Sequence, residues 1–226
     1  MKVKYLGHSC FQIHTKGNIL VIDPFITPNE KASHIDISSI KADYILLSHG
    51  HQDHIADAET ICKATGAKII SNYDIVMWFK EKGLEGHPMN LGGSWDFDFG
   101  NIKLVNAVHS SSFPDGSYAG NPVGFVISNK EGCFYFSGDT ALTMDMQLIP
   151  KTSPSLDFAI LCIGDNFTMG YQDAILASEF IACDKIVACH YDTFGWITID
   201  KEKVIKAFEA NGKEIIFMNI SEERTF

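Results

Sequence analysis

Apolar residues along the chain form two kinds of pattern, short continuous runs and helically spaced positions. Short runs such as Tyr44-Ile45-Leu46-Leu47 predict buried strands, and similar runs recur near residues 133–136, 157–163, 185–190 and 213–220. Four other segments have helical spacing, and two of them end at a glycine, as helices commonly do. These predicted helices span residues 57–66, 74–83, 171–182 and 200–211.

Hairpins are predicted at the start of each half of the chain. The first should turn at Lys16-Gly17-Asn18, with His8 in the middle of its first strand. Later hairpins should turn at residues 99–101 and 129–132, and strands and helices alternate after them. This mixture predicts two βαβ-containing halves whose sheets pack face to face with helices outside, an α/β four-layer αββα sandwich. No low-complexity linker divides the chain, so one domain over residues 1–226 is expected.

Composition limits the class of protein. Apolar residues make up 46% and charged residues 20%, as in an ordinary globular chain. The net charge of −10 argues against a nucleic-acid binder, which would carry a basic face. No run is long and apolar enough for a membrane span or a signal peptide, and the six cysteines include no CxxC pair. A protein of the reducing cytoplasm is expected, with monomer or homo-oligomer left open.

Four metal-binding side chains directly follow the predicted strand at 44–47. They are His49, His51, Asp53 and His54. Residues i and i+2 of an extended segment point the same way, so His49 and His51 could share one metal ion. Asp53 and His54 stand where a helix would begin and could turn toward a second ion. Imidazole and carboxylate ligands suit zinc or manganese, and also iron or nickel.

Four residues cannot fill two catalytic metal sites, so further ligands should follow other strands. His109, Asp139 and His190 are each the first ionisable group after an apolar run. Such residues gather at the carboxyl ends of strands, where α/β sheets place their sites. Together the seven residues supply enough ligands for two divalent ions.

At this point the sequence resembles a known family. The stretch SHGHQDH (residues 48–54) is similar to the HxHxDH signature of the metallo-β-lactamase superfamily, and His109, Asp139 and His190 follow in that superfamily's order. The stretches GHSCFQI, VIDPFI, IGDNFTMG and ACHYDTFG resemble uncharacterised metal-dependent hydrolases close to the ascorbate-6-phosphate lactonases, which are cytoplasmic enzymes. The resemblance implies the metallo-β-lactamase form of the αββα sandwich. It also implies one metal on His49, His51 and His109, a second on Asp53, His54 and His190, and Asp139 bridging both.

Two departures from related lineages narrow the chemistry. Flavodiiron-type oxygen reductases have glutamate where His51 stands, which disfavours redox chemistry at a di-iron centre. Secreted β-lactamases of the superfamily have cysteine where Asp139 stands. Glyoxalase-like thioesterases share the ligand set and stay open.

The ligand set predicts hydrolysis. Two divalent ions can share a water, lower its pKa toward about 7 and aim the resulting hydroxide at a carbonyl carbon or phosphorus. Asp53 could orient that hydroxide. The expected substrate is a small anionic ester, lactone or phosphoester. A thioesterase, a phosphodiesterase or nuclease, and a non-catalytic metal-dependent sensor are the alternatives.

Four further polar residues have both a structural and a functional interpretation. Asp23 could orient a histidine ligand or simply begin the turn at Pro24, and Asp57 could do the same or begin a helix. His8 could be a structural histidine, or a substrate-binding or proton-donating group. Asn166 could cap the following helix or bind a substrate oxygen. The loop 110–124 after His109 could cover the pocket.

Overall fold

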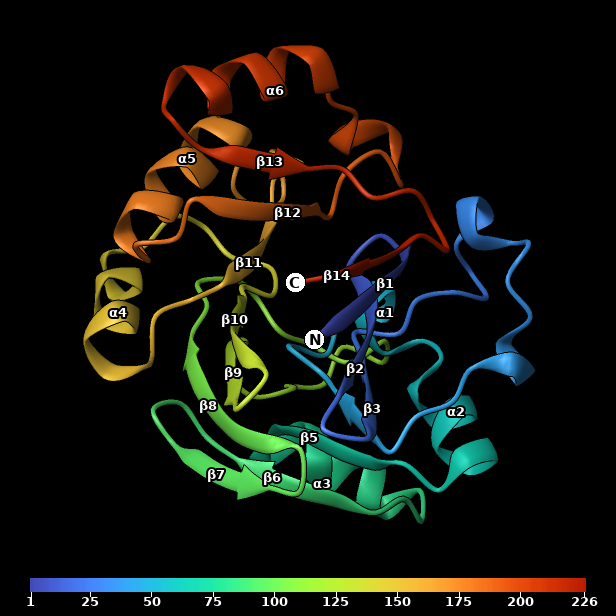
Figure 1. The fold of residues 1–226 in the computed structure, drawn as a ribbon. Coiled ribbons are helices and arrows are strands. Elements are labelled where there is room, and N and C mark those ends of the chain that lie inside the picture. The colour runs from blue at the N-terminus through green and yellow to red at the C-terminus, as the bar shows by residue number, and fades with distance from the viewer.

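The computed structural model describes residues 1–226 and contains two seven-stranded mixed sheets (Figure 1). The N-terminal sheet has the order β14-β1-β2-β3-β4-β5-β6, and the C-terminal sheet has the order β13-β12-β11-β10-β9-β8-β7. The strands of the N-terminal sheet are β1 (Lys2–Gly7), β2 (Cys10–Thr15), β3 (Asn18–Ile22), β4 (Tyr44–Leu46), β5 (Lys68–Asn72), β6 (Gly86–Met89) and β14 (Glu223–Thr225). Those of the C-terminal sheet are β7 (Ser94–Phe97), β8 (Gly100–Asn106), β9 (Val123–Asn129), β10 (Gly132–Phe136), β11 (Phe158–Cys162), β12 (Lys185–Cys189) and β13 (Glu214–Ile216).

The two sheets have the same internal plan. In each, the hairpin strands pair antiparallel and the later strands pair parallel, from β3 to β6 and from β10 to β13. The parallel strands are joined by helices, as right-handed crossovers require. Strands β3, β4, β10 and β12 all end on the same side of the sandwich, and the polar residues singled out in the sequence follow them there.

Helices cover the outer faces of both sheets. Figure 1 shows α2 and α3 on the N-terminal side and α4, α5 and α6 on the C-terminal side. The helices are α1 (Gln52–Ile55), α2 (Ala58–Thr65), α3 (Tyr73–Glu81), α4 (Ile149–Thr152), α5 (Tyr171–Phe180) and α6 (Lys201–Ala210), with 3₁₀ turns η1 (Glu30–Ala32), η2 (Ile37–Ser39), η3 (Met144–Leu148) and η4 (Gly195–Ile197). The predicted αββα sandwich is confirmed, and so are the four predicted helices.

Alternation along the strands fills two cores. Leu46 and Ile70 face the large core between the sheets, whereas their neighbours Ile45 and Ile69 face a smaller core beneath α2 and α3. Successive residues of a strand point to opposite faces, so a strand covered on both sides must be apolar throughout. This explains why the runs after residues 44 and 68 read as continuously apolar.

The prediction of one long first strand was wrong. The chain turns at His8-Ser9, so residues 2–15 form two strands, β1 and β2, instead of one. Gly7 has φ +101° and His8 φ +56°, which places the turn in the left-handed region. Sequence periodicity did not reveal the break because apolar residues occur on both sides of it. The pattern also missed β6, β14 and α4, which are only three or four residues long.

The longest helices, α5 and α6, have ten residues each, and no helix has the length and hydropathy that a membrane span requires.

Candidate metal centre

The seven predicted ligands converge at the seam between the two sheets. His49, His51, Asp53 and His54 follow β4 of the N-terminal sheet, with Asp53 and His54 in the short helix α1. The other three follow strands of the C-terminal sheet, namely His109 after β8, Asp139 after β10 and His190 after β12. Residues up to 141 positions apart in the chain thus form one cluster.

Three histidines form the first group of the cluster. Ligand atoms of His49, His51 and His109 lie within 4.8 Å of one another. His49 Nε2 is 3.0 Å from His51 Nδ1, so the two rings present different nitrogens to a common point. This spacing fits three nitrogens around one cation.

Asp53, His54 and His190 form the second group. Their ligand atoms, together with one from His8, also lie within 4.8 Å of one another. Asp53 Oδ2 is 3.7 Å from His54 Nε2 and 3.8 Å from His190 Nε2. The Asp53 side chain is 27% exposed, so the cluster is open to solvent on this side.

Asp139 lies between the two groups. Its Oδ2 is 2.9 Å from His190 Nε2 and 3.3 Å from His54 Nε2 in the second group. The same oxygen is 3.7 Å from His109 Nε2 and 3.9 Å from His49 Nε2 in the first. One carboxylate oxygen therefore faces both groups, as a bridging ligand would. Gly138 permits this approach, because a Cβ there would lie 2.8 Å from the carbonyl oxygen of Val123.

A buried network from Asp23 orients two of the histidines. Asp23 Oδ2 is 2.7 Å from His54 Nδ1 and accepts a 2.5 Å hydrogen bond from the Ser48 hydroxyl. Because that hydroxyl donates to Asp23, it must accept from His49 Nδ1, 2.9 Å away. His49 and His54 therefore both turn Nε2 toward the cluster. Asp23 therefore contacts the cluster through His54, which corresponds to one of the two roles that the sequence left open for it.

The loop after His109 packs against the first group. Ser110 Oγ is 3.3 Å from His51 Nε2, and the Gly50 N–H donates to Ser111 Oγ. A Cβ at Gly50 would lie 2.3 Å from Ala119 Cβ, so the backbone between His49 and His51 touches this loop directly. The loop thus lies beside the site, and Asn72 holds its far end through two hydrogen bonds to carbonyls.

Several buried polar atoms of the cluster fit a bound cation. His54 Nε2 and Asp139 Oδ1 are buried without a hydrogen-bond partner, which is rare for such atoms. If His51 Nε2 donates to Ser110, then His51 Nδ1 and His49 Nε2 direct lone pairs at one another across 3.0 Å. Facing lone pairs repel, and a metal ion between them removes the repulsion. The residues present therefore fit metal ions.

Burial and neighbouring charges shift the pKa values of the cluster. Burial lowers the pKa of His49, His51 and His109, which favours the neutral imidazole that binds metal. Burial alone would also lower the pKa of His54, yet the surrounding carboxylates raise it well above 6.5. Burial would raise the pKa of Asp53 and of Asp139, but the neighbouring histidines outweigh it and lower both. In the metal-free protein, His54 thus carries a proton where a cation is favoured.

His8 is buried beside the second group with partners on both ring nitrogens. Its Nε2 is 3.0 Å from Asp53 Oδ2, and its Nδ1 is 2.9 Å from the hydroxyl oxygen of Thr193. Burial lowers the pKa of His8 to about 4. Sequence reasoning missed Thr193, which is 185 positions away and carries no pattern of its own. It could only have been singled out through the resemblance of the ACHYDTFG stretch.

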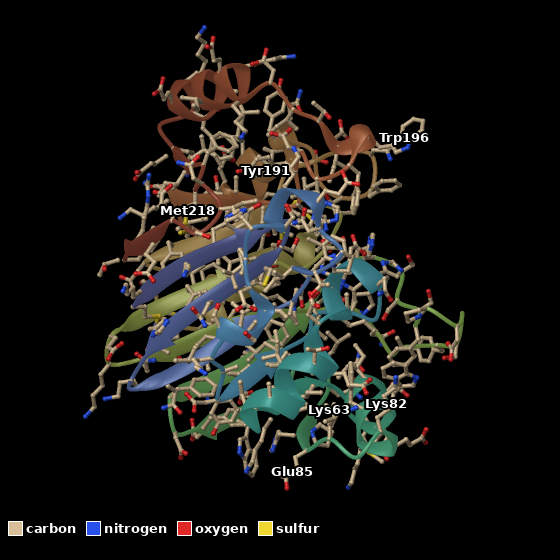
Figure 2. All side chains as sticks on the ribbon, turned by 90° about the vertical axis from the view of Figure 1, so that its right-hand side faces the viewer. Lys63, Lys82, Glu85, Tyr191, Trp196 and Met218 are labelled. Carbon is tan, nitrogen blue, oxygen red and sulfur yellow. The ribbon has the colours of Figure 1, made fainter.

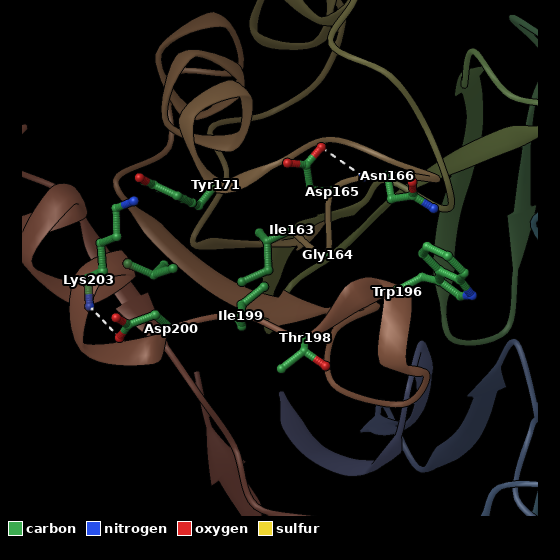
Figure 3. Close-up of a pocket in the computed structure, with 11 residues that line it drawn as sticks. Ile163, Gly164, Asp165, Asn166, Tyr171, Trp196, Thr198, Ile199, Asp200 and Lys203 are labelled. Atoms are coloured by element: carbon green, nitrogen blue, oxygen red, sulfur yellow. Dashed lines mark hydrogen bonds between the residues drawn. The ribbon is translucent and has the colours of Figure 1, made fainter.

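Asn166 is not in contact with the cluster in the structure. It lines a cavity of about 370 Å³ between the loop before α5 and the start of α6, together with Trp196 and Lys203 (Figure 3). Its backbone N–H donates to the Asp165 side chain, and none of the seven clustered residues lines this cavity. Trp196 projects from the molecule nearby, with 78% of its surface exposed (Figure 2). Asn166 is also not the cap of α5, which is Gly170.

Asp57 has a structural place. Its Oδ2 accepts hydrogen bonds from the N–H groups of Ile26 and Thr27 and thereby fixes the chain after β3. It makes no side-chain cap at the start of α2.

Three residues around the cluster have left-handed backbone conformations. They are His8, Asp23 and His190, with φ of +56°, +44° and +54°. Such conformations are costly for residues other than glycine and tend to occur at functional sites. Here they turn side chains inward directly at the ends of strands β1, β3 and β12.

Comparison with known proteins agrees with this geometry. Residues 2–190 match the family model of the beta-lactamase superfamily domain. UPF0173 metal-dependent hydrolases from Christiangramia forsetii and Flavobacterium johnsoniae are 56% and 54% identical to the chain, each aligned over 98% of both sequences. The solved structure of Igni18, a metallo hydrolase from Ignicoccus hospitalis, has a TM-score of 0.90 at 33% identity and covers 100% of this chain and 97% of its own. With this fold and this cluster, the chain belongs to the metallo-β-lactamase superfamily and, within it, to the UPF0173 metal-dependent hydrolases.

Proposed function

We propose that the protein is a dinuclear-metal hydrolase that acts on a small anionic ester, lactone or phosphoester. The observation that carries the proposal is Asp139 Oδ2, which lies within 2.9–3.9 Å of histidine nitrogens from both groups. A single metal would need only one of these groups.

The proposed ligands divide as the two groups do. His49, His51 and His109 hold one ion, Asp53, His54 and His190 hold the other, and Asp139 contacts both. Zinc and manganese suit these ligands best, and iron and nickel share the preference for imidazole and carboxylate. When bound, two such ions lower the pKa of a shared water and polarise the substrate's oxygen.

The chain's own residues support water as the nucleophile. All six cysteines are buried, and burial raises the pKa of Cys62 and Cys133 to about 12, so their thiols are inert at neutral pH. Ser48 and Ser110, which contact the cluster, are hydrogen-bonded to histidines. Six free thiols also support the expectation of a reducing compartment such as the cytoplasm.

Asp53 is the residue proposed to orient the nucleophile. It is the most exposed of the carboxylates in the cluster, and burial is outweighed by histidines that keep its pKa low, so it is ionised. An ionised carboxylate accepts a hydrogen bond from an attacking water and fixes its direction. His8 acts in the proposed reaction through its contact with Asp53. A direct contact of His8 with substrate, which the sequence also suggested, would require breaking one of its two hydrogen bonds.

The charge of the proposed substrate follows from the charge of the metal centre. Two divalent ions outweigh the two carboxylates that the proposal gives them, so the site attracts an anion. Asn166, which lines a separate cavity with Trp196 and Lys203, is not assigned a contact with this small substrate.

The test is hydrolysis by protein loaded with manganese, zinc or nickel, with lactones, carboxylic esters, phosphodiesters and thioesters as substrates. We expect turnover of a lactone, ester or phosphoester that disappears after chelation and in Asp139→Ala. Activity on thioesters alone would show that the substrate is a thioester instead of a lactone, ester or phosphoester. No turnover of any substrate by protein holding two ions per chain would contradict hydrolysis and favour a metal-dependent sensor.

A further inference from the structure

We propose that Thr193 is a positioning residue whose hydroxyl holds His8 in the tautomer that donates from Nε2 to Asp53. This inference rests on the proposed function in one respect, because the importance of Asp53 depends on its place in the metal centre. The hydrogen-bond arrangement itself can be measured without any hydrolysis.

The three side chains form a chain of two short hydrogen bonds. Thr193 Oγ1 is 2.9 Å from His8 Nδ1, and His8 Nε2 is 3.0 Å from Asp53 Oδ2. They come from three separate places in the fold, namely the segment after β12, the β1–β2 turn and helix α1. Thr193 thus connects the C-terminal sheet to a carboxylate supplied by the N-terminal one.

The direction of both hydrogen bonds follows from the chemistry of the groups. An ionised carboxylate can only accept, so His8 Nε2 must carry the hydrogen that points at Asp53. A buried imidazole favours its neutral form, which leaves Nδ1 without a hydrogen and able to accept. The Thr193 hydroxyl must then donate to Nδ1. Its other acceptor, the Tyr191 carbonyl oxygen, lies at the longer distance of 3.4 Å.

Asp53 is the group that gains a fixed orientation. The oxygen that His8 contacts, Oδ2, is also the one that faces His54 Nε2 and His190 Nε2 at 3.7 and 3.8 Å. A carboxylate oxygen has two lone-pair directions, so a hydrogen bond along one leaves the other for the metal. The hydrogen bond from His8 therefore fixes the rotation of the Asp53 carboxylate.

The backbone of His8 is held independently of Thr193. Its carbonyl oxygen accepts hydrogen bonds from the Tyr5 hydroxyl and from the His190 N–H, at 3.1 and 3.0 Å. The His8 ring also packs 4.3 Å from the ring of His190 and 5.3 Å from that of Phe194. Removing the Thr193 hydroxyl should therefore change the hydrogen bonding and the tautomer of the His8 ring, while the ring keeps its position in the fold.

One rival arrangement makes the opposite prediction about the same ring. A ring nitrogen of His8 lies within 4.8 Å of ligand atoms of Asp53, His54 and His190, and Nε2 is 3.0 Å from Asp53 Oδ2, so Nε2 could bind the metal itself. In that arrangement, Nε2 has no hydrogen and Nδ1–H donates to Thr193. The tautomer of His8 therefore distinguishes a positioning role from a ligand role.

The first experiment is NMR of the metal-loaded protein with ¹⁵N-labelled histidine, in which His8→Asn identifies the His8 signals. We expect the hydrogen on Nε2 in the wild type and in Thr193→Ser. In Thr193→Val, which has the shape of threonine but no hydroxyl, Nδ1 loses its donor, so we expect the Nδ1 signal to move and part of the Nε2–H population to be averaged with the other tautomer. A hydrogen on Nδ1 alone, a hydrogen on both nitrogens, or an unchanged spectrum in Thr193→Val would each overturn the proposal.

The second experiment is a competition titration with a zinc chelator, followed by kinetics on any substrate found. Thr193→Val should weaken the more weakly held zinc and lower kcat by about 10–100-fold, the usual effect of losing a partner behind a metal ligand. Thr193→Ser should restore both, and Thr152→Val, on the exposed helix α4, should change neither. Equal zinc affinity in Thr193→Val and wild type would contradict the proposal. If no variant hydrolyses anything while the affinities and tautomers behave as expected, the proposed reaction fails and the role of Thr193 stands.

Discussion

At the scale of single residues, the site depends on which nitrogen each histidine turns inward. His49 and His54 present Nε2 because Ser48 and Asp23 occupy their other nitrogens, whereas His51 presents Nδ1. A substitution among the partners should therefore alter metal binding without removing a ligand. Substitution of a ligand itself should have a larger effect.

Asp139→Ala removes the oxygen that faces both groups. We expect the variant to lose at least one metal and nearly all activity, because buried histidine nitrogens from both groups lose a shared counter-charge. Metal analysis of the purified protein measures the first effect. Asp173→Asn, an exposed carboxylate in the first turn of α5, is the control and should retain both ions. Two ions retained in Asp139→Ala would exclude the bridging role.

His8→Ala should still bind two metals, one of them more weakly, and lower turnover by about 10–100-fold, because it removes a partner of Asp53 and no proposed ligand. His8→Asn belongs beside it, since asparagine tolerates the left-handed backbone of this position better than alanine. Metal content and kcat are the measurements. Unchanged kinetics in both variants would leave His8 with a structural role only.

Predictability from sequence was uneven at this scale. The seven clustered residues were identifiable because each follows an apolar run and because the stretch from His49 to His54 resembles a known signature. Their division between two ions remains a prediction. The partners of the histidines were harder to find, since Thr193 and Ser110 are common residue types whose role exists only through contacts across the two sheets.

At the scale of elements, glycines let backbones approach the cluster closely. Gly164, just after β11, is the tightest case, since a Cβ there would lie 2.1 Å from the carbonyl oxygen of His190. A side chain at position 164 would therefore push against the backbone of His190. This contact was invisible in the sequence, where Gly164 reads as an ordinary turn glycine.

Gly164→Ala should displace His190 and weaken metal binding, with a loss of stability of about 1–3 kcal/mol from the forced contact. Urea unfolding and metal analysis measure the two effects. Gly195→Ala is the matched control, because a Cβ at Gly195 meets nothing within 4 Å. Equal metal content and stability in the two variants would show that the strand ends can move apart.

The elements themselves were predictable where a pattern was long enough. Helices α2, α3, α5 and α6 followed from helical spacing, and the ends of α2 and α3 from Gly66 and Gly83. The β1–β2 turn was missed because apolar residues occur on both sides of it, and because one of its two left-handed residues is a histidine. Short edge strands such as β6 and β14 depend on pairing with a neighbour and have no periodicity of their own.

At the scale of the whole molecule, the buried histidines make stability depend on pH. Burial lowers the pKa of His8, His49, His51 and His109 below the ordinary value of 6.5, so below that pH the unfolded chain binds protons that the fold does not. Their contribution to stability is therefore lost as the pH falls. His54 acts in the opposite sense, because its raised pKa stabilises the fold below about pH 6.5. Between about pH 6.5 and 5, the loss of stability from the four histidines with lowered pKa is larger than the effect of His54.

The metal-free protein should accordingly have a lower Tm at pH 5 than at pH 7, by about 5 °C or more for a chain of this size. Calorimetry in the presence of a chelator measures it. Asp53 and Asp139, whose pKa values are lowered, add a further loss only below about pH 4. A Tm at pH 5 equal to or above that at pH 7 would contradict this assignment of protonation states.

The position of the cluster on the seam couples metal binding to the assembly of the two halves of the sandwich. Each group takes ligands from both sheets, with His109 or His190 joining residues that follow β4. An ion that binds only when the sheets are docked favours the docked state by mass action, by about 2.7 kcal/mol at a free concentration one hundred times its Kd. Removing the metal should therefore lower Tm by roughly 5–10 °C. It should also increase hydrogen exchange first in the segments that cross the seam, namely α1 and the residues after β12. In the cell, metal supply would then set how long the folded chain survives as well as whether it is active.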